Sequence, residues 1–254
     1  MIDPTFAVSE VNSWGVKHPK QVRRALDCCD ALENAMPEPP GWEGLYNPST
    51  VAEAVEANAR YNAASGEAAR TAYNSARFNL GKHLLTTVAD NLDQYAKQWE
   101  PRFAKAAEAY ETSAKELPAE FTANQVVTFS PEKFEAYTRA CEAVTELHTV
   151  MRWLQTISHN IPGQWFHHEQ WTKEFLILEP GSVSSFATIQ LADTRGADEA
   201  LKKVDPVLLK AVHAGASLVF RLPAEALNSV RSWEERRQSL SDEQWARARA
   251  EVLA

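Results

Sequence analysis

Residues 49–117 decide the fold of this chain, and they read STVAEAVEANARYNAASGEAARTAYNSARFNLGKHLLTTVADNLDQYAKQWEPRFAKAAEAYETSAKEL. In the second half of this stretch, apolar side chains recur every three or four residues. This spacing keeps them on one face of a helix and would scatter them along a strand. The members of the stripe are Tyr73, Ala76, Leu80, Leu84, Val88, Leu92, Tyr95, Trp99, Phe103, Ala107, Tyr110, Ala114 and Leu117. The pattern predicts one very long helix, or two helices end to end.

The first half of the stretch, residues 49–72, is rich in alanine instead. Alanine favours the helical conformation but buries little apolar area. We therefore expect this half to lie close against another backbone or to stay partly exposed. A straight helix over residues 49–100 would be on the order of 75 Å long, at about 1.5 Å per residue. A rod of that length implies a partner surface, either within the chain or between chains.

Two residues within the stretch disfavour an uninterrupted helix. Gly66 costs about 1 kcal/mol in a helix interior relative to alanine, so a break or bend is expected there. Pro101 clashes with the carbonyl group four residues before it. The stripe nevertheless keeps its phase from Trp99 to Phe103. This continuity favours a kinked continuation at Pro101 over a short break.

A second helix is predicted over residues 130–160, and it supplies the partner for residues 73–117. Ser130 and Pro131 are favourable at a helix cap and at the first helical position. Its apolar stripe is Phe134, Tyr137, Cys141, Val144, His148 and Met151. The two helices are expected to pack antiparallel in coiled-coil fashion. The predicted fold class is mainly α, an elongated helical bundle with a long kinked helix and a small β-hairpin.

Four parts make up the predicted domain organisation. Residues 1–48 form an N-terminal arm, a short helix and a proline-rich linker, and residues 49–163 form the long helical hairpin. Residues 164–195 are irregular and aromatic-rich, and residues 196–254 form C-terminal helices. These C-terminal helices are expected to begin at Pro206, reaching about Phe220, at Pro223, and at the Ser241–Gln244 capping box.

Short β-structure is expected at two places in the chain. The run Val126–Phe129 is predicted to be a brief strand. Strands over Glu174–Leu178 and Val183–Leu191 are predicted to form a hairpin. The turn between them contains proline and glycine, which supply the angles of a tight reversal.

The amino-acid composition argues against some classes of function. The 254 residues are 24% charged, and the hydrophobic set makes up 44%, which is typical of a folded globular protein. The net charge of −8 argues against nucleic-acid binding and against an anionic membrane surface. The sequence contains no apolar run long enough to span a membrane, and we see no secretory signal at the N-terminus. Three cysteines, two of them adjacent at Cys28 and Cys29, do not form a disulfide framework, so a cytoplasmic location is expected.

One polar cluster has residue types that could bind a metal ion. Imidazole and carboxylate groups suit Zn²⁺, but their spacing matches no paired-histidine helical motif. Surface histidines beside an aromatic patch are therefore the simpler interpretation. The residues concerned are His159, His167, His168, Glu169 and Glu174. His148 lies on the helical stripe and is interpreted as a hydrogen-bonded core histidine.

Neither a phosphate-binding glycine loop nor a nucleophile motif occurs in the sequence, so it predicts no catalytic residue and no cofactor. The leading hypothesis is a non-enzymatic structural or assembly protein. It would self-associate or dock into a larger complex, such as a virion or scaffold, through its helical rod. A metal-dependent enzyme using the histidine cluster is the third hypothesis.

The second hypothesis is an adaptor or regulator that binds a protein partner through exposed aromatic side chains. Trp42 and Tyr46 stand in the proline-rich linker, where they either pack on the long helix or dock a partner. Packing on the helix is the favoured interpretation for these two residues. A second candidate patch consists of Trp165, Phe166 and Trp171.

Overall fold

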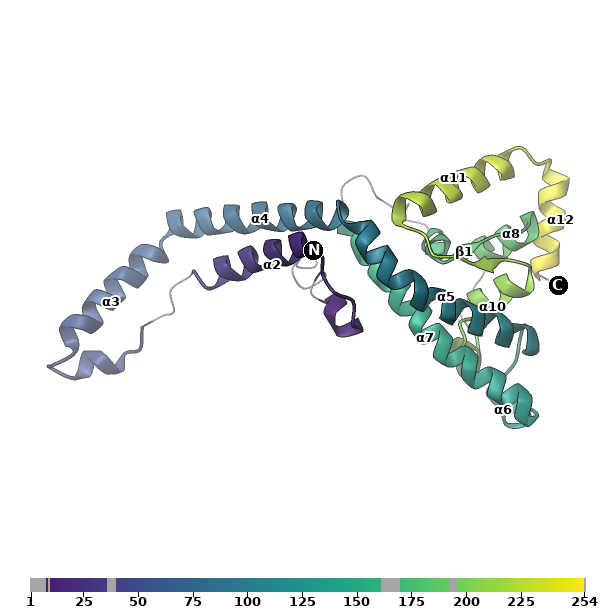
Figure 1. The fold of residues 1–254 in the computed structure, drawn as a ribbon, viewed down its shortest axis with the longest axis horizontal. Helices are drawn as coiled ribbons and strands as arrows, with labels where there is room; N and C mark the ends of the chain where they lie inside the picture. The colour runs from purple at the N-terminus through teal and green to yellow at the C-terminus, as the bar shows by residue number, and fades with distance from the viewer. Residues whose placement is uncertain (1–7, 9, 36–39, 161–169, 192–195, 254) are drawn as a thin grey trace. The chain divides into compact units, whose positions relative to one another are not determined.

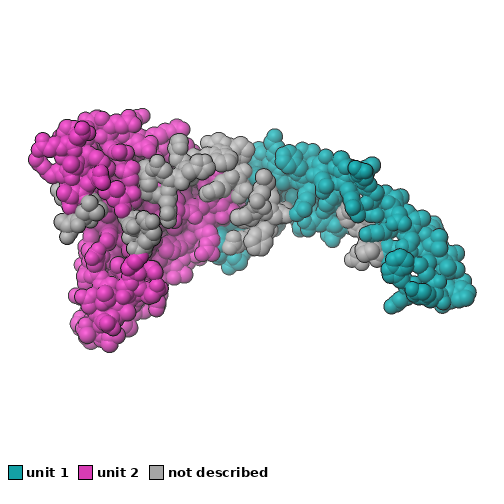
Figure 2. Space-filling model, turned by 180° about the vertical axis from the view of Figure 1, so that it is seen from behind, with its two compact units in different colours: residues 1–91 teal, residues 92–254 magenta. Residues whose placement is uncertain are grey.

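A computed structural model describes residues 8, 10–35, 40–160, 170–191 and 196–253. The fold is mainly α, and the described part contains one small two-stranded antiparallel sheet (Figure 1). This confirms the predicted class, a mainly α fold with a small β-element. The chain divides into two compact units, residues 1–91 and residues 92–254 (Figure 2).

Unit 1 is built from helices with a thin core. Its elements are η1 (Glu10–Trp14), α2 (Lys20–Glu33), η2 (Glu43–Tyr46), α3 (Val51–Ala64) and α4 (Glu67–Ala89). Helix α2 packs along α4 (Figure 1). The buried residues of these two helices are Val22, Ala25, Leu26 and Cys29 in α2, and Leu84 and Val88 in α4.

Unit 2 is organised around α5 (Leu92–Glu116) and α7 (Pro131–Asn160), which lie side by side (Figure 1). The rings of Trp99 and Trp153 are 5.8 Å apart at one end of the pair. At the other end, the guanidinium group of Arg139 is 3.6 Å from the carboxylate of Glu116. The order of these contacts makes the pair antiparallel, as predicted. Coiled-coil geometry for this packing stays a prediction.

The other elements of unit 2 are shorter. They are α6 (Ala123–Val127), η3 (Gln170–Leu176), β1 (Leu178–Glu179), α8 (Val183–Leu191), α9 (Glu199–Lys202), α10 (Pro206–His213), β2 (Ser217–Leu218), α11 (Pro223–Gln238) and α12 (Asp242–Leu253). The Phe186 ring stacks on Trp233 at 5.5 Å and meets the edge of Phe175 at 6.1 Å. These aromatic contacts join η3, α8 and α11 in a second apolar core.

The long stretch predicted as one or two helices is three helices. Breaks fall at Ser65–Gly66 and at Asp90–Asn91. Gly66 has extended backbone angles, φ −61° and ψ 164°, and stands at the N-cap of α4. Pro101 lies inside α5, which runs through it, as the phase of the stripe indicated. The prediction of a break near Gly66 is confirmed, and the break at Asp90–Asn91 was not predicted.

Three local predictions are wrong. The run Val126–Phe129 is not a strand, because α6 occupies Ala123–Val127. Residues Val183–Leu191 form α8, and β1 pairs with β2 instead, with Leu178 opposite Leu218. Helix α10 ends at His213 rather than near Phe220. Gly215, with φ 86°, takes the left-handed conformation that commonly follows a helix end.

Candidate functional site

Helix α3 is a regular helix because of its local sequence. Six of its fourteen residues are alanine, the best helix former. The hydroxyl of Thr50 donates to the Gly44 carbonyl at 2.9 Å, which ties η2 to the start of the helix. Arg60 and Glu56, one turn apart, form an ion pair at 2.5 Å. An exposed pair of this kind contributes only about 0.3–0.5 kcal/mol.

None of the fourteen residues of α3 is buried. In α4, 23 residues long, the buried residues are Leu84 and Val88, both in its C-terminal half. An isolated helix shorter than about 12–15 residues is marginally stable in water, because most helix stability comes from packing. Residues 51–83 of the predicted rod therefore contain no buried side chain, although most of them are helical.

Among the described residues, large apolar side chains are exposed mainly on unit 1. They are Trp42, Tyr46, Val51, Val55 and Phe78, and we call them the exposed apolar set of unit 1. Val127 and Phe134 are the two that unit 2 exposes among the described residues. Large exposed apolar area marks interaction sites in proteins, and five of the seven exposed large apolar side chains of the described residues belong to unit 1. Unit 1 is thus the candidate interaction site of the chain.

The structure describes only part of the predicted aromatic site. Trp42 is 67% exposed and Tyr46 is 83% exposed, so the interpretation that they pack on the long helix is wrong. Trp165 and Phe166 lie outside the described residues. Trp171 lies in η3, and its side chain is not among those described. Partner binding by these residues stays a prediction.

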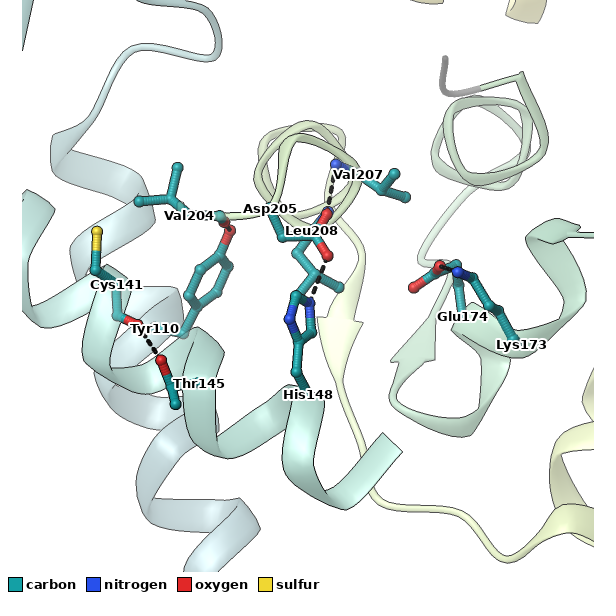
Figure 3. A network of polar contacts seen from close by, with 10 residues as sticks. All are labelled: Tyr110, Cys141, Thr145, His148, Lys173, Glu174, Val204, Asp205, Val207 and Leu208. Atoms are coloured by element: carbon teal, nitrogen blue, oxygen red, sulfur yellow. Dashed lines mark hydrogen bonds and ion pairs between the residues drawn. The ribbon is translucent and has the colours of Figure 1, made fainter. Parts of the chain in front are cut away.

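A polar network in unit 2 is a second candidate site (Figure 3). Asp205 stands at the N-cap of α10, where its Oδ1 accepts from the backbone amides of Val207 at 2.9 Å and Leu208 at 3.2 Å. Its Oδ2 lies 2.7 Å from Nε2 of His148 on α7. Burial opposes ionisation of Asp205, but these contacts outweigh it and lower the pKa of the carboxyl.

His148 is hydrogen-bonded, as predicted, although its side chain is 36% exposed and so lies at the edge of the core. An aspartate–imidazole pair can position a general base. The nucleophile must then lie within hydrogen-bond distance of the other ring nitrogen. The described contacts of His148 include no such group. The thiol of Cys141 does not fill this role, because burial raises its pKa. The network therefore fastens α10 to α7, and its geometry does not make it a catalytic site.

Glu174 is a buried carboxyl group close to this network (Figure 3). Its Oε1 is 3.7 Å from the Lys173 ammonium group, and its Oε2 has no hydrogen-bond partner among the described residues. Burial is the main cause that raises the pKa of Glu174 to about 7, and the nearby Asp205 carboxylate adds to the shift. The position of Glu174 directly before the apolar run Phe175–Leu178 was a signal for this group, because charged side chains are rarely buried.

The predicted metal cluster lies mostly outside the described residues, which include neither His167, His168 nor Glu169. The chain of His159 is in α7, but its side chain is not described. Elsewhere in the described part of the chain, no three His, Cys, Asp or Glu side chains are grouped to hold a metal ion.

An open depression of about 510 Å³ lies in unit 2 between α5 and β2. Its walls include Glu100, Glu108, Glu111 and Phe220. Glu111 accepts a 2.6 Å hydrogen bond from the backbone amide of Leu218, so this acid fastens β2 to α5. The depression is shallow and carries its acids along one helix, which gives it the character of a surface feature.

Comparison with known proteins adds no family to this description. The chain matches none of the protein-family models, curated sequences or solved structures with which it was compared. Among the described helices, even α4, α5 and α7 lack the continuous apolar length that a bilayer crossing requires.

Proposed function

We propose that this chain is a non-enzymatic assembly protein, and that helices α3 and α4 bind another protein chain. The observation that carries the proposal is that α3, a helix of fourteen residues, has no buried side chain. A helix with so little packing gains stability when a partner covers it. A component of a scaffold or virion would use a helical rod in this way, by analogy with where such rods occur.

The exposed apolar set indicates the kind of contact that this interface would make. Val55 is 56% exposed and Phe78 is 72% exposed, while alanines occupy many positions between them. Small side chains let two helix axes approach to about 8 Å, the short end of the usual range. Valine and phenylalanine then supply apolar area at roughly 25 cal/mol per Å². The surface therefore suits a helical partner.

Light scattering coupled to size-exclusion chromatography tests the proposal on the full chain. The wild-type protein is expected to have a molar mass above that of one chain, increasing with concentration. Val51→Lys with Val55→Lys places two charges on the apolar face of α3. This variant is expected to weaken association at least about tenfold and to leave the helical circular dichroism signal of the rest of the chain intact.

A control places one such charge on unit 2. Val127, which is 85% exposed in α6, is the counterpart of Val55, and Val127→Lys is expected to keep the wild-type molar mass. A wild-type protein that remains a monomer at every concentration would contradict self-association. Equal weakening by both variants would show that the contact does not depend on α3.

A second candidate function is an adaptor that binds a different protein through Trp42 and Tyr46. It is supported by the exposure of both rings, since tryptophan and tyrosine often anchor interfaces. Trp42→Ala with Tyr46→Ala separates the two candidates. If the chain is an adaptor, this variant no longer binds the partner protein, and its molar mass in solution is that of the wild type. If the chain is an assembly protein that uses α3 and α4, the variant keeps both its partner binding and its wild-type molar mass.

A further inference from the structure

A buried carboxyl group lies beside the polar network of α7 and α10. Glu174 of η3 is 5% exposed, and its Oε2 has no hydrogen-bond partner among the described residues. The carboxylate of Asp205 and the imidazole of His148 both act on it electrostatically (Figure 3). Buried polar atoms without a partner are uncommon in folded proteins. This carboxyl group is therefore the least satisfied member of the network.

We propose that this part of unit 2 is a pH-sensitive switch, in which loss of the Glu174 proton opens η3 to water. The switch lies beyond the contact assigned to α3 and α4 and does not depend on it. An ionised carboxylate is strongly stabilised by water, so its burial without a hydrogen-bond donor is unfavourable. The neutral carboxyl group avoids most of this penalty. Protonated Glu174 therefore favours a closed η3, and ionised Glu174 favours an open one.

The charged groups around Glu174 do not compensate for its burial. The Lys173 ammonium group, 3.7 Å from Oε1, and the His148 imidazole both favour the carboxylate. The Asp205 carboxylate opposes it, because like charges repel strongly in a buried setting. Burial is the largest effect, and together with Asp205 it raises the pKa of Glu174 to about 7.

The remaining elements packed against η3 supply no further charge to Glu174. Helix α8 contains no ionisable side chain. The Glu179 carboxylate of β1 accepts hydrogen bonds from Ser229 and Trp233 of α11 instead. Within the described part of the chain, no charged side chain of α11 is among the groups that act on Glu174. The ionisation of this carboxyl group thus depends on three neighbours and on its burial.

The chain that follows Glu174 is held in place, which keeps the opening local. The backbone carbonyl of Ile177 accepts the amide of Val219 at 2.9 Å. The Arg221 guanidinium group donates to the carbonyl of Leu178, also at 2.9 Å. The segment η3 itself is a 3₁₀ helix, whose hydrogen bonds have poorer geometry than those of an α-helix. Opening is therefore expected to begin at Glu174 and to leave the strand pair in place.

The direction of the pH effect follows from the two protonation equilibria of Glu174. In the closed state its pKa is about 7, whereas an open and hydrated carboxyl group has the ordinary value of 4.5. The closed state is therefore favoured most below pH 4.5, and this preference is lost as the pH rises through 7. Between these two values, the ratio of open to closed molecules increases by up to about tenfold per pH unit.

Hydrogen exchange of single amides, measured by NMR on the full chain at one low protein concentration, tests the switch. The Ile177 amide is the reporter, because it donates to the Glu174 carbonyl at 3.0 Å. Between pH 5 and pH 8, its protection factor is expected to fall at least about tenfold more in the wild type than in Glu174→Gln. Glu142→Gln, at an exposed acid of α7, is the control and should follow the wild type. Amides in the middle of α5 and α7 should keep their protection in all three proteins.

The carbon-13 chemical shift of the Glu174 carboxyl group is a second measurement, and it needs no variant. Its titration midpoint is expected at about pH 7, and a midpoint near 4.5 would overturn the switch. Equal changes in Ile177 protection in the wild type and in Glu174→Gln would overturn it as well. So would a loss of protection that α5 and α7 share, because the unit would then unfold as a whole. None of these results bears on association through α3 and α4, which is measured by molar mass.

Discussion

Asp205 is the residue on which the contact between α10 and α7 depends. It accepts two backbone amides of α10 and the imidazole of His148 through separate oxygens. It does so with φ at 56°, which is uncommon for a residue with a side chain. Aspartate tolerates this conformation better than most residues, because its short polar side chain bonds locally. Asp205 thus makes its three hydrogen bonds in a conformation with a positive φ angle.

Replacing this carboxyl group should be costly. Asp205→Ala removes the helix cap and leaves His148 without its acceptor, so we expect the free energy of unfolding to fall by on the order of 2 kcal/mol. Urea denaturation measures this loss. Glu199→Ala is the matched control, because Glu199 also stands in the first turn of a helix but is 83% exposed. A loss for Asp205→Ala no larger than that of the control would contradict the role given to this cap.

Glu174 should make the stability of the protein depend on pH. Its folded pKa of about 7 lies above the ordinary value of 4.5, so the folded state holds the proton more tightly than the unfolded state. The resulting stabilisation is fully present below pH 4.5 and is lost as the pH rises through 7. At about 1.4 kcal/mol per unit, the wild type should lose about 2 kcal/mol relative to Glu174→Gln between pH 5 and pH 8.

Chemical denaturation of both proteins at the two pH values measures this difference. Glu135→Gln serves as the control, because the side chain of Glu135 is 69% exposed. The control should follow the wild-type pH dependence. If the difference between wild type and Glu174→Gln stays constant from pH 5 to pH 8, Glu174 does not titrate in this range.

At the scale of elements, α5 and α7 form the core on which unit 2 is built. Trp153 of α7 packs against Tyr95 at 5.1 Å and against Trp99 at 5.8 Å. Trp153→Ala should reduce the free energy of unfolding by about 3–5 kcal/mol, because a cavity replaces a large buried ring. The neighbouring Arg152→Ala, on the exposed face, should change it by less than about 0.5 kcal/mol. Thermal and urea denaturation of the two variants distinguish a core position from a surface position.

The periodicity of the sequence predicted these two helices well. An apolar side chain every three or four residues requires a partner face, and α5 and α7 satisfy one another. The caps at Ser130 and Ser241 were also predicted, since the hydroxyl of each accepts a backbone amide three residues later. Sequence patterns that span one or two helical turns were therefore sufficient to predict this part of the fold.

The wrong predictions share a physical cause. Val126 and Val183 begin short runs with high strand propensity, but helix caps precede both. Thr122 and Gln125 form a capping box at α6, and the hydroxyls of Ser182 and Ser185 each accept the amide of the other at α8. Local capping outweighed the strand propensity of these short runs. The pairing of β1 with β2 joins segments far apart in the sequence, and no local pattern contains that information.

The candidate site was predictable only in outline. The alanine content of residues 49–72 indicated a helix with little to bury, and α3 is such a helix. The network of His148, Asp205 and Glu174 could not be predicted, because three separate elements bring these side chains together. In the sequence, His148 could be recognised only as a histidine on the helical stripe. Asp205 could be recognised only as a helix cap, and Glu174 only as an acid beside an apolar run.

At the scale of the whole molecule, the two units differ in how they are stabilised. Unit 2 has aromatic cores around Trp153 and Phe186, and most of its helices bury a face. In unit 1, burial within α2 and α4 is limited to a few side chains, and α3 has none. A difference of this kind is expected when one unit is a folded body and the other completes its packing against a partner.

Hydrogen exchange measured by mass spectrometry at low and high protein concentration tests this central claim most directly. We predict that the backbone amides of residues 51–89 exchange rapidly in dilute solution and become protected as the concentration rises. The amides of α5 and α7 should be protected at both concentrations, because their partner lies in the same chain. Exchange in residues 51–89 that does not change with concentration, or new protection confined to unit 2, would contradict the account.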